Sequence, residues 1–191
     1  MRELKLFVVL LLAGILLSCA GSSEKAKHGS SGPCPEWFSN VPEDPNYLFG
    51  AATAVSRDLQ IAINKAKTEG TAEIAKQIEL HIQGLTKKFD EEVGLGENAN
   101  LYAKFTQATK LVIDQTLRGV KVRYQDTKPE EAGWRACVLM EFNLNETNEG
   151  LIDGISKERE MYIRFRDSQT FKELEKEVEK YRQYKKEEGL P

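Results

Sequence analysis

The sequence contains little histidine and cysteine, the side chains that most often bind transition metals. Only two histidines are present, His28 and His81. His28 falls in a segment of small polar residues, and His81 has no histidine, cysteine or acid at ligand spacing on its predicted helix. His81 also has no nearby nucleophile in the sequence that it could activate. The sequence therefore predicts no metal site, and we assign His81 no catalytic role.

A large excess of charge of either sign is missing too. The chain has 27 basic and 30 acidic residues, for a formal net charge of -3. Removing residues 1–18 takes away two basic side chains and one acidic one, which leaves 25 against 29 and a net charge of -4. Nucleic-acid binding requires clustered Lys and Arg, and so does an electrostatic hold on anionic lipid. We expect neither.

The common catalytic motifs are absent. No G-x-S-x-G, P-loop or H-E-x-x-H string occurs. The segment 94–99 has the glycine spacing of a dinucleotide fingerprint, but that fingerprint leaves a strand and opens a helix, whereas these glycines join two helical stretches. We expect no catalytic residues, no enzymatic activity and no bound cofactor.

The sequence has a single long hydrophobic run, which lies near the start of the chain. Arg2 and Lys5 precede an apolar run from Leu6 to Leu17, and small residues follow. A membrane-spanning helix needs about 20 apolar residues, so this run is short for that purpose. Basic, apolar and small regions in this order are typical of a secretory signal peptide, which we assign to residues 1–18.

The end of the run resembles a bacterial lipoprotein signal. The residues Leu16-Leu17-Ser18-Cys19 resemble a lipobox, with a small residue just before a cysteine that follows the apolar run. The resemblance implies cleavage between Ser18 and Cys19, and covalent diacylglycerol and N-acyl lipid on Cys19. Several acyl chains would hold the protein stably to a membrane. An uncleaved anchor and an ordinary signal peptide with an incidental cysteine are the alternatives.

The residue after the lipobox cysteine suggests which membrane. It is Ala20, whereas an aspartate there resembles an inner-membrane retention mark. We therefore expect lipid anchoring in the outer membrane. Residues 19–34 would form the lipidated cysteine and a flexible tether, because they carry no aromatic or branched aliphatic side chain that could pack.

The rest of the chain predicts one α+β domain over residues 35–145. Residues 47–55 are aromatic and β-branched and predict a strand. Apolar residues at helical spacing then predict a long helix with Ser56 as N-cap and a possible break near Gly84. A second helix follows Asn98. Alternating residues predict two antiparallel strands, at 120–125 and 134–142, with a loop at 126–133 between them.

The last part of the chain, 146–191, is predicted to be mainly a charged C-terminal helix. Helical spacing runs from Leu151 to Glu188. It could pack Tyr162, Phe165 and Phe171 on the domain, or extend as a partner-binding arm. The expected fold is therefore a small β-α-β-β domain with long amphipathic helices packed on a short antiparallel sheet, plus this helix.

Two cysteines remain beside Cys19. An oxidising periplasm would allow Cys34 and Cys137 to form a disulfide. The alternative is a buried thiol at Cys137 and a free thiol at Cys34, and the sequence leaves both open.

The pattern of the mature chain resembles the Lpp-twenty family, named for a twenty-kilodalton outer-membrane lipoprotein. The resemblance covers roughly residues 35–142. It is carried by Trp37-Phe38, segment 47–51, the helix 66–78, segment 116–120 and segment 137–140. The family implies a β-α-β-β envelope domain without enzymatic activity, found in surface lipoproteins and in accessory proteins of the flagellar base.

These observations favour a non-enzymatic structural or interaction module, anchored in the cell envelope, that binds an envelope protein or further copies of itself. Two alternatives remain open. One is an accessory component of a flagellar or secretion base, which would dock through the charged C-terminal helix. The other is a carrier of a small apolar ligand held between the helices and the sheet.

Overall fold

The computed structural model describes residues 32–189, and it shows an α+β fold. The signal peptide, Ser18, Cys19 and most of the tether lie outside the described residues. A short helix, α2 (Glu36–Ser39), comes first and leads to strand β1 (Tyr47–Ser56). The chain then enters helix α3 (Leu59–Val93), passes a 3₁₀ turn, η1 (Leu95–Glu97), and continues in helix α4 (Ala99–Thr116).

The sheet has three antiparallel strands in the order β1-β3-β2. A second 3₁₀ turn, η2 (Leu117–Gly119), leads into β2 (Lys121–Glu130), and β3 (Gly133–Asn143) follows. β3 is central, and both other strands are edges. The hairpin is tighter than predicted: β2 continues to Glu130, which pairs with Gly133. The predicted loop at 126–133 is therefore wrong, since most of it is strand.

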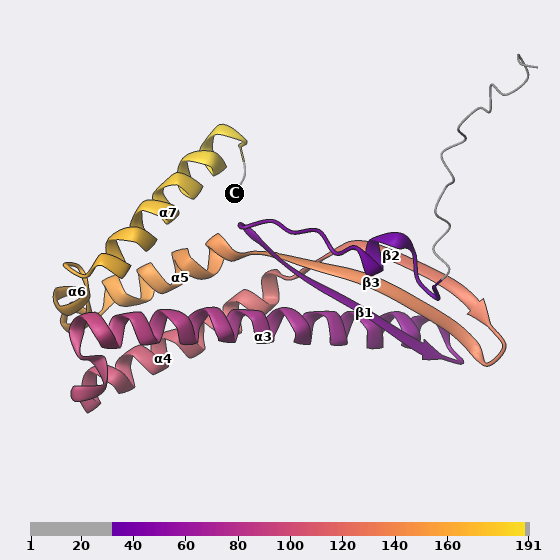
Figure 1. The fold of residues 1–191 in the computed structure, drawn as a ribbon, viewed down its shortest axis with the longest axis horizontal. Helices are drawn as coiled ribbons and strands as arrows, with labels where there is room; N and C mark the ends of the chain where they lie inside the picture. Colours follow the sequence, from indigo (N-terminus) through magenta and orange to yellow (C-terminus); the bar gives the residue numbers. More distant parts are fainter. Residues whose placement is uncertain (1–31, 190–191) are drawn as a thin grey trace, which may run out of the picture.

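Helix α3 runs along the molecule and connects its two halves. Figure 1 shows its first half under the sheet and its second half among α4, α5 and α6. The buried residues facing the sheet include Ala66, Gly70 and Ile74. Further along, Phe89 packs against Phe105 of α4, with ring centroids 5.7 Å apart. One helix thus contributes to the sheet layer and to the helical bundle.

The predicted start of α3 needs correction, and its possible break does not occur. Asp58, not Ser56, is the N-cap, and its Oδ1 accepts a hydrogen bond of 2.9 Å from Ile61 N. Ser56 is still the last residue of β1. Gly84 lies on the exposed side of an uninterrupted helix, where it is tolerated at modest cost. The helix ends at Gly94, whose φ of 62° is left-handed.

The C-terminal region is three helices and not one. They are α5 (Leu144–Lys157), α6 (Arg159–Phe165) and α7 (Gln169–Glu187). Ser168 caps α7 by accepting from Phe171 N at 3.2 Å, which explains the last interruption.

These helices share the core of the sheet domain. Ile152, Phe165 and Phe171 belong to the same buried cluster as Ile74 and Met140. The aromatic residues Phe165 and Phe171 are each about 1 % exposed or less, as expected if the C-terminal region packs on the domain. Tyr162 differs, since its side chain is 39 % exposed.

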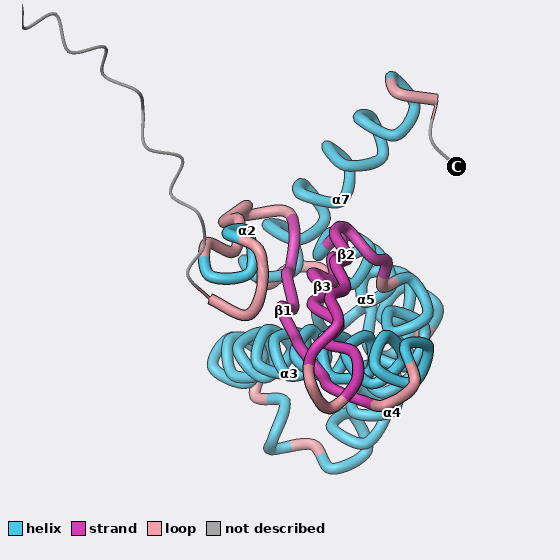
Figure 2. The backbone as a smooth tube through the Cα atoms, turned by 90° about the vertical axis from the view of Figure 1, so that its right-hand side faces the viewer, coloured by secondary structure: helices cyan, strands magenta, loops and turns pink. Residues whose placement is uncertain are grey.

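The two faces of the sheet are covered by different parts of the chain. Alternate residues of β3, among them Val138 and Met140, face α3. The opposite face meets the segment that contains α2, where the rings of Trp37 and Tyr124 lie 5.7 Å apart. Figure 2 shows this segment on the side of the sheet away from α3.

Candidate functional site

Cys34 and Cys137 are joined by a disulfide, with their Cα atoms 5.8 Å apart. Cys34 precedes α2, and Cys137 lies in the middle of β3, on the face opposite α3. Both side chains are buried. The bond therefore fixes the first described residues to the central strand of the sheet. It is a structural link, since its sulfur atoms are not exposed to a reaction partner.

His81 lies on α3 and contacts the buried Asn148 of α5. The distance between His81 Nε2 and Asn148 Oδ1 is 2.8 Å. Asn148 is only 3 % exposed, so its amide needs a partner within the fold. With the amide oxygen as acceptor, His81 donates through Nε2. The imidazole therefore helps to satisfy a buried polar group where α3 and α5 meet.

Beside His81 lies a hollow of about 650 Å³, which we call the tyrosine cleft. Its lining comes from the start of β1, the first turns of α5 and the second half of α7. Three tyrosines contribute to it, Tyr47 from β1 and Tyr181 and Tyr184 from α7. The remaining lining residues are mostly polar: Pro45, Asn46, His81, Asn143, Leu144, Asn145, Asn148, Glu177 and Lys180.

Asparagines hold the floor of the tyrosine cleft together. Asn143 Oδ1 caps α5 by accepting from Asn145 N at 3.0 Å. Asn145 Nδ2 donates to Asn143 Oδ1 at 3.2 Å and to Asn46 Oδ1 at 3.3 Å. The backbone of Asn46 accepts from Leu144 N at 2.8 Å. The amides thus bind one another and fix where β1 begins relative to α5.

The environment of Tyr181 opposes its ionisation. Burial raises the pKa of its phenol to about 12, and the negative charges of Glu146 and Glu149 act in the same direction. Tyr181 therefore stays a neutral hydrogen-bonding group at any physiological pH. Tyr184, one turn later on α7, also lines the cleft and is 48 % exposed.

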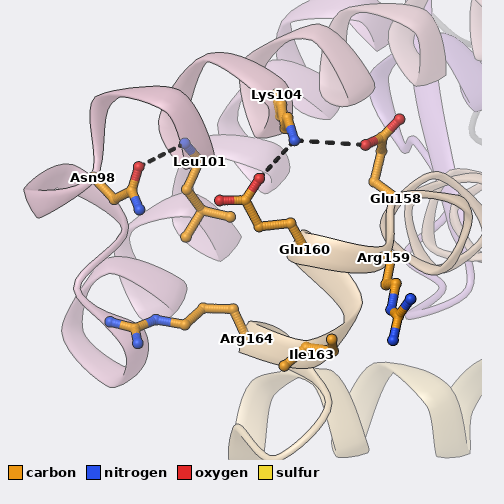
Figure 3. A pocket seen from close by; sticks show the side chains of 8 residues that line it. All are labelled: Asn98, Leu101, Lys104, Glu158, Arg159, Glu160, Ile163 and Arg164. Atoms are coloured by element: carbon orange, nitrogen blue, oxygen red, sulfur yellow. Dashed lines mark hydrogen bonds and ion pairs between the residues drawn. The ribbon is translucent and has the colours of Figure 1, made fainter.

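A second hollow, of about 640 Å³, lies between α4 and α6 (Figure 3). Lys104 Nζ of α4 lies 2.6 Å from Glu160 and 3.8 Å from Glu158. The hydrogen bond with Glu160 raises the pKa of the Lys104 ammonium despite some desolvation. Arg164 Nε donates to Val93 O at the end of α3, at 3.2 Å. These charges bind one another across helices, so the hollow is better explained as a packing contact of α6.

Within residues 32–189, no group of three or more His, Cys, Asp or Glu side chains could hold a metal ion. None of the helices in this part of the chain is long and apolar enough to cross a membrane.

Sequence reasoning did not find the tyrosine cleft. Its aromatic rings come from residues 47, 181 and 184, which only the packing of α7 brings near β1. The one local signal was the repeated asparagine at 143 and 145, an N-cap pattern at a strand-to-helix junction.

No family model matches the chain, and a search of curated proteins found no match. The resemblance to the Lpp-twenty family therefore remains a pattern in the residues.

Proposed function

We propose that the protein is a non-enzymatic lipoprotein of the bacterial envelope, anchored in the outer membrane by lipid on Cys19, whose domain binds another envelope protein through the tyrosine cleft. The anchor rests on the lipobox-like residues 16–19 after the apolar run. The binding role rests on one structural observation, the three tyrosines that line a concave surface. The resemblance to the Lpp-twenty family points to the same cellular setting.

The composition of the cleft favours protein recognition. Tyrosine offers a large apolar ring with a hydroxyl at low conformational-entropy cost, and it is enriched at binding hot spots. The asparagines and His81 are already bonded within the fold, where they position the backbone. Acid-base catalysis needs a base that can reach a reacting group. Because the asparagines and His81 already form hydrogen bonds within the fold, they favour a preformed binding surface instead.

The described residues give less support to the two alternative functions, a carrier of an apolar ligand and a component of a flagellar or secretion base. A carrier of an apolar ligand would need a cavity between the helices and the sheet, but Ile74, Ile78 and Met140 fill that space. An accessory part of a flagellar or secretion base would dock through the charged C-terminal helix. Phe171, Leu174 and Val178 of α7 are buried on the domain, so docking there would have to use the charged side and the exposed Tyr184, which already belongs to the tyrosine cleft.

The anchor is tested by labelling growing cells with a palmitate analogue. The native chain should be labelled and should fractionate with the outer membrane, and Cys19→Ala should lose the label. Labelling of both chains alike, or of neither, would exclude the lipid on Cys19.

The partner is tested by crosslinking in cells and affinity capture from detergent-solubilised envelopes. Capture of one abundant envelope protein by the native chain but not by Cys19→Ala is expected. Tyr184→Ala should weaken that capture by about tenfold, as expected for a hot-spot tyrosine. Tyr102→Ala is the matched control, because Tyr102 on α4 is equally exposed, at 48 %, and lies outside the cleft. Equal effects of the two variants would remove the cleft from the proposal.

A further inference from the structure

The two edges of the sheet differ in how they are protected from pairing. β2 carries Lys121, Arg123 and Lys128, Pro129, and a register irregularity between Val122 and Tyr124. Charges, proline and bulges are the usual means by which edge strands avoid further pairing. β1 spans ten residues, has no charged residue and no proline, and pairs with β3 in unbroken register. The β1 edge therefore lacks the protection that β2 has.

Two hydrogen bonds show which backbone groups of β1 face this edge. Leu144 N donates to Asn46 O, which places the even-numbered residues in hydrogen bonds with β3. Gln77 Nε2 of α3 donates to Phe49 O at 2.8 Å, so an odd-numbered carbonyl faces away from β3. By this alternation, Ala51 and Thr53 direct their N–H and C=O groups to the free edge. No other described strand pairs with them.

A groove of about 810 Å³ follows these backbone groups. One side is β1 from Ala51 to Ala54, and the other is α3, with Ile61, Lys65 and Glu69. Phe38, from the α2 segment, lies at its border. Figure 2 shows the arrangement end-on: β1 at the side of the sheet away from β2, α3 beneath it and the α2 segment above. The groove thus has a backbone template, small side chains and two flanking elements.

We infer that this groove binds an extended, uncharged peptide segment of a partner protein, which adds to the sheet as a fourth strand beside β1. Strand addition of this kind gains affinity from main-chain hydrogen bonds and specificity from alternate side chains. The inference goes beyond the proposed function, because the groove shares no lining residue with the tyrosine cleft and would be a second binding site.

The groove indicates the chemistry of the inserted strand. The α3 wall carries Lys65 and Lys76 against Glu69 and Glu73, so it has no net charge to attract a charged peptide. Ile61 is 48 % exposed and offers an apolar contact to one side of the strand. The positions facing α3 need small side chains, because β1 itself lies so close to α3 that glycines meet at Gly50 and Gly70.

A second copy of the chain fits this groove less well than a single strand. If two β1 edges paired antiparallel, the two α3 helices would lie on the same face of the joined sheet. Residues of α3 already form a wall beyond the β1 edge, so the second α3 would enter space that the first occupies. A partner strand that brings no helix with it avoids this collision.

The test uses the full chain in detergent and a display library of random peptides of about ten residues, a strand length. Selected peptides are compared on the native chain, Ala51→Pro and Gln125→Pro. Proline at Ala51 removes a donor that faces the free edge and leaves the bonds to β3 in place. Gln125→Pro makes the matched change on β2, where Gln125, like Pro129, alternates with residues bonded to β3. Ile61→Ser, an exposed helix position, serves as a second groove variant that does not alter the sheet.

We expect selected peptides to be uncharged and β-branched or small. Ala51→Pro should lower the affinity for the selected peptides about tenfold, and Ile61→Ser should lower it severalfold. Gln125→Pro should leave the affinity unchanged. Binding should also slow amide hydrogen exchange in β1. Failure to select any peptide, binding insensitive to both groove variants, or a dimer of the chain that Ala51→Pro abolishes would each overturn the inference. The lipid label on Cys19 is read separately, so loss of the anchor and loss of the groove are distinguishable.

Discussion

Gly50 of β1 and Gly70 of α3 bring a strand and a helix into backbone contact. A Cβ added to Gly70 would lie 3.0 Å from the carbonyl oxygen of Gly50 and close to Met140 Cγ. No side chain could therefore separate the two elements at this point. The contact sets the distance at which Ile74 and Ile78, further along α3, reach the sheet.

The Gly70 contact predicts opposite effects of two glycine substitutions in the same helix. Gly70→Ala should lower the free energy of unfolding by about 1–3 kcal/mol, because the added methyl group overpacks the core. Gly84→Ala should raise it by about 0.5–1 kcal/mol, because a Cβ there meets nothing within 4 Å and alanine favours the helix. Urea denaturation measures both changes. Destabilisation by both variants alike would contradict the close contact.

The disulfide predicts a large loss of stability on its removal. Cys34 and Cys137 are 103 residues apart, and in the chain-entropy model a loop of that size is worth about 4–5 kcal/mol. The double variant Cys34→Ala, Cys137→Ala should therefore unfold at much lower urea concentration than the native chain. Reduction should destabilise the native chain and leave the double variant unchanged. Because the bond is buried, its presence is checked by thiol labelling of the unfolded chain, and two reactive thiols at positions 34 and 137 without reductant would show that the cysteines are not bonded.

The phenol of Tyr181 predicts that the free energy of unfolding depends on pH in the alkaline range. Since its pKa is raised from 10.0 to about 12, the folded state retains the phenol proton where the unfolded state releases it. The stability that this provides is complete below pH 10 and is lost as the pH rises toward 12. Ultraviolet titration of tyrosinate should show one group ionising near 12 that Tyr181→Phe lacks. Ionisation of that group near 10 would contradict the burial of the phenol.

The carboxylate of Glu92 predicts that the free energy of unfolding depends on pH in the acid range. Burial alone would raise its pKa, but hydrogen bonds from the Thr170 hydroxyl and the Thr170 N–H outweigh it and lower the pKa. Glu92→Gln should weaken the attachment of α7 by no more than about 1 kcal/mol, because the carboxylate is largely exposed. The difference from the native chain should be present above pH 4.5 and disappear as the pH falls below it.

Denaturation at several pH values measures this difference. Glu91→Gln is the matched control, because Glu91 is also exposed and its only ion pair among the described residues is with Lys87 of the same helix. An equal loss of stability in both variants would mean that the bond to Thr170 contributes nothing of its own.

The elements of the fold could be predicted because their periodicity is strong. Apolar spacing from Ala62 to Ile82 and alternation from Trp134 to Phe142 depend on the buried faces alone, and both appear in the structure. The hairpin differs from the prediction because Pro129 is typical of a loop, although the structure places it in β2. It lies in the edge strand at a position that faces away from β3, where no backbone N–H is required.

The candidate sites could not be predicted in the same way. The tyrosine cleft depends on how α7 returns to the start of β1, and nothing in the local sequence of α7 sets that direction. The groove beside β1 depends on strand order, which places β3 and not β1 in the centre. Serine is a favoured N-cap residue, so Ser168 is a local signal for a helix start before α7. The apolar spacing on both sides of Ser168 nevertheless predicts one continuous helix.

The link between Cys34 and β3 also governs how the domain bears tension. A pull on the residues before Cys34 passes through the disulfide straight to the middle strand, and the chain between the two cysteines carries none of it. Pulling β3 out of the sheet would require breaking its hydrogen bonds with β1 and β2 together. For a domain pulled from its N-terminal end, the disulfide makes the central strand, the one paired on both sides, the point of attachment.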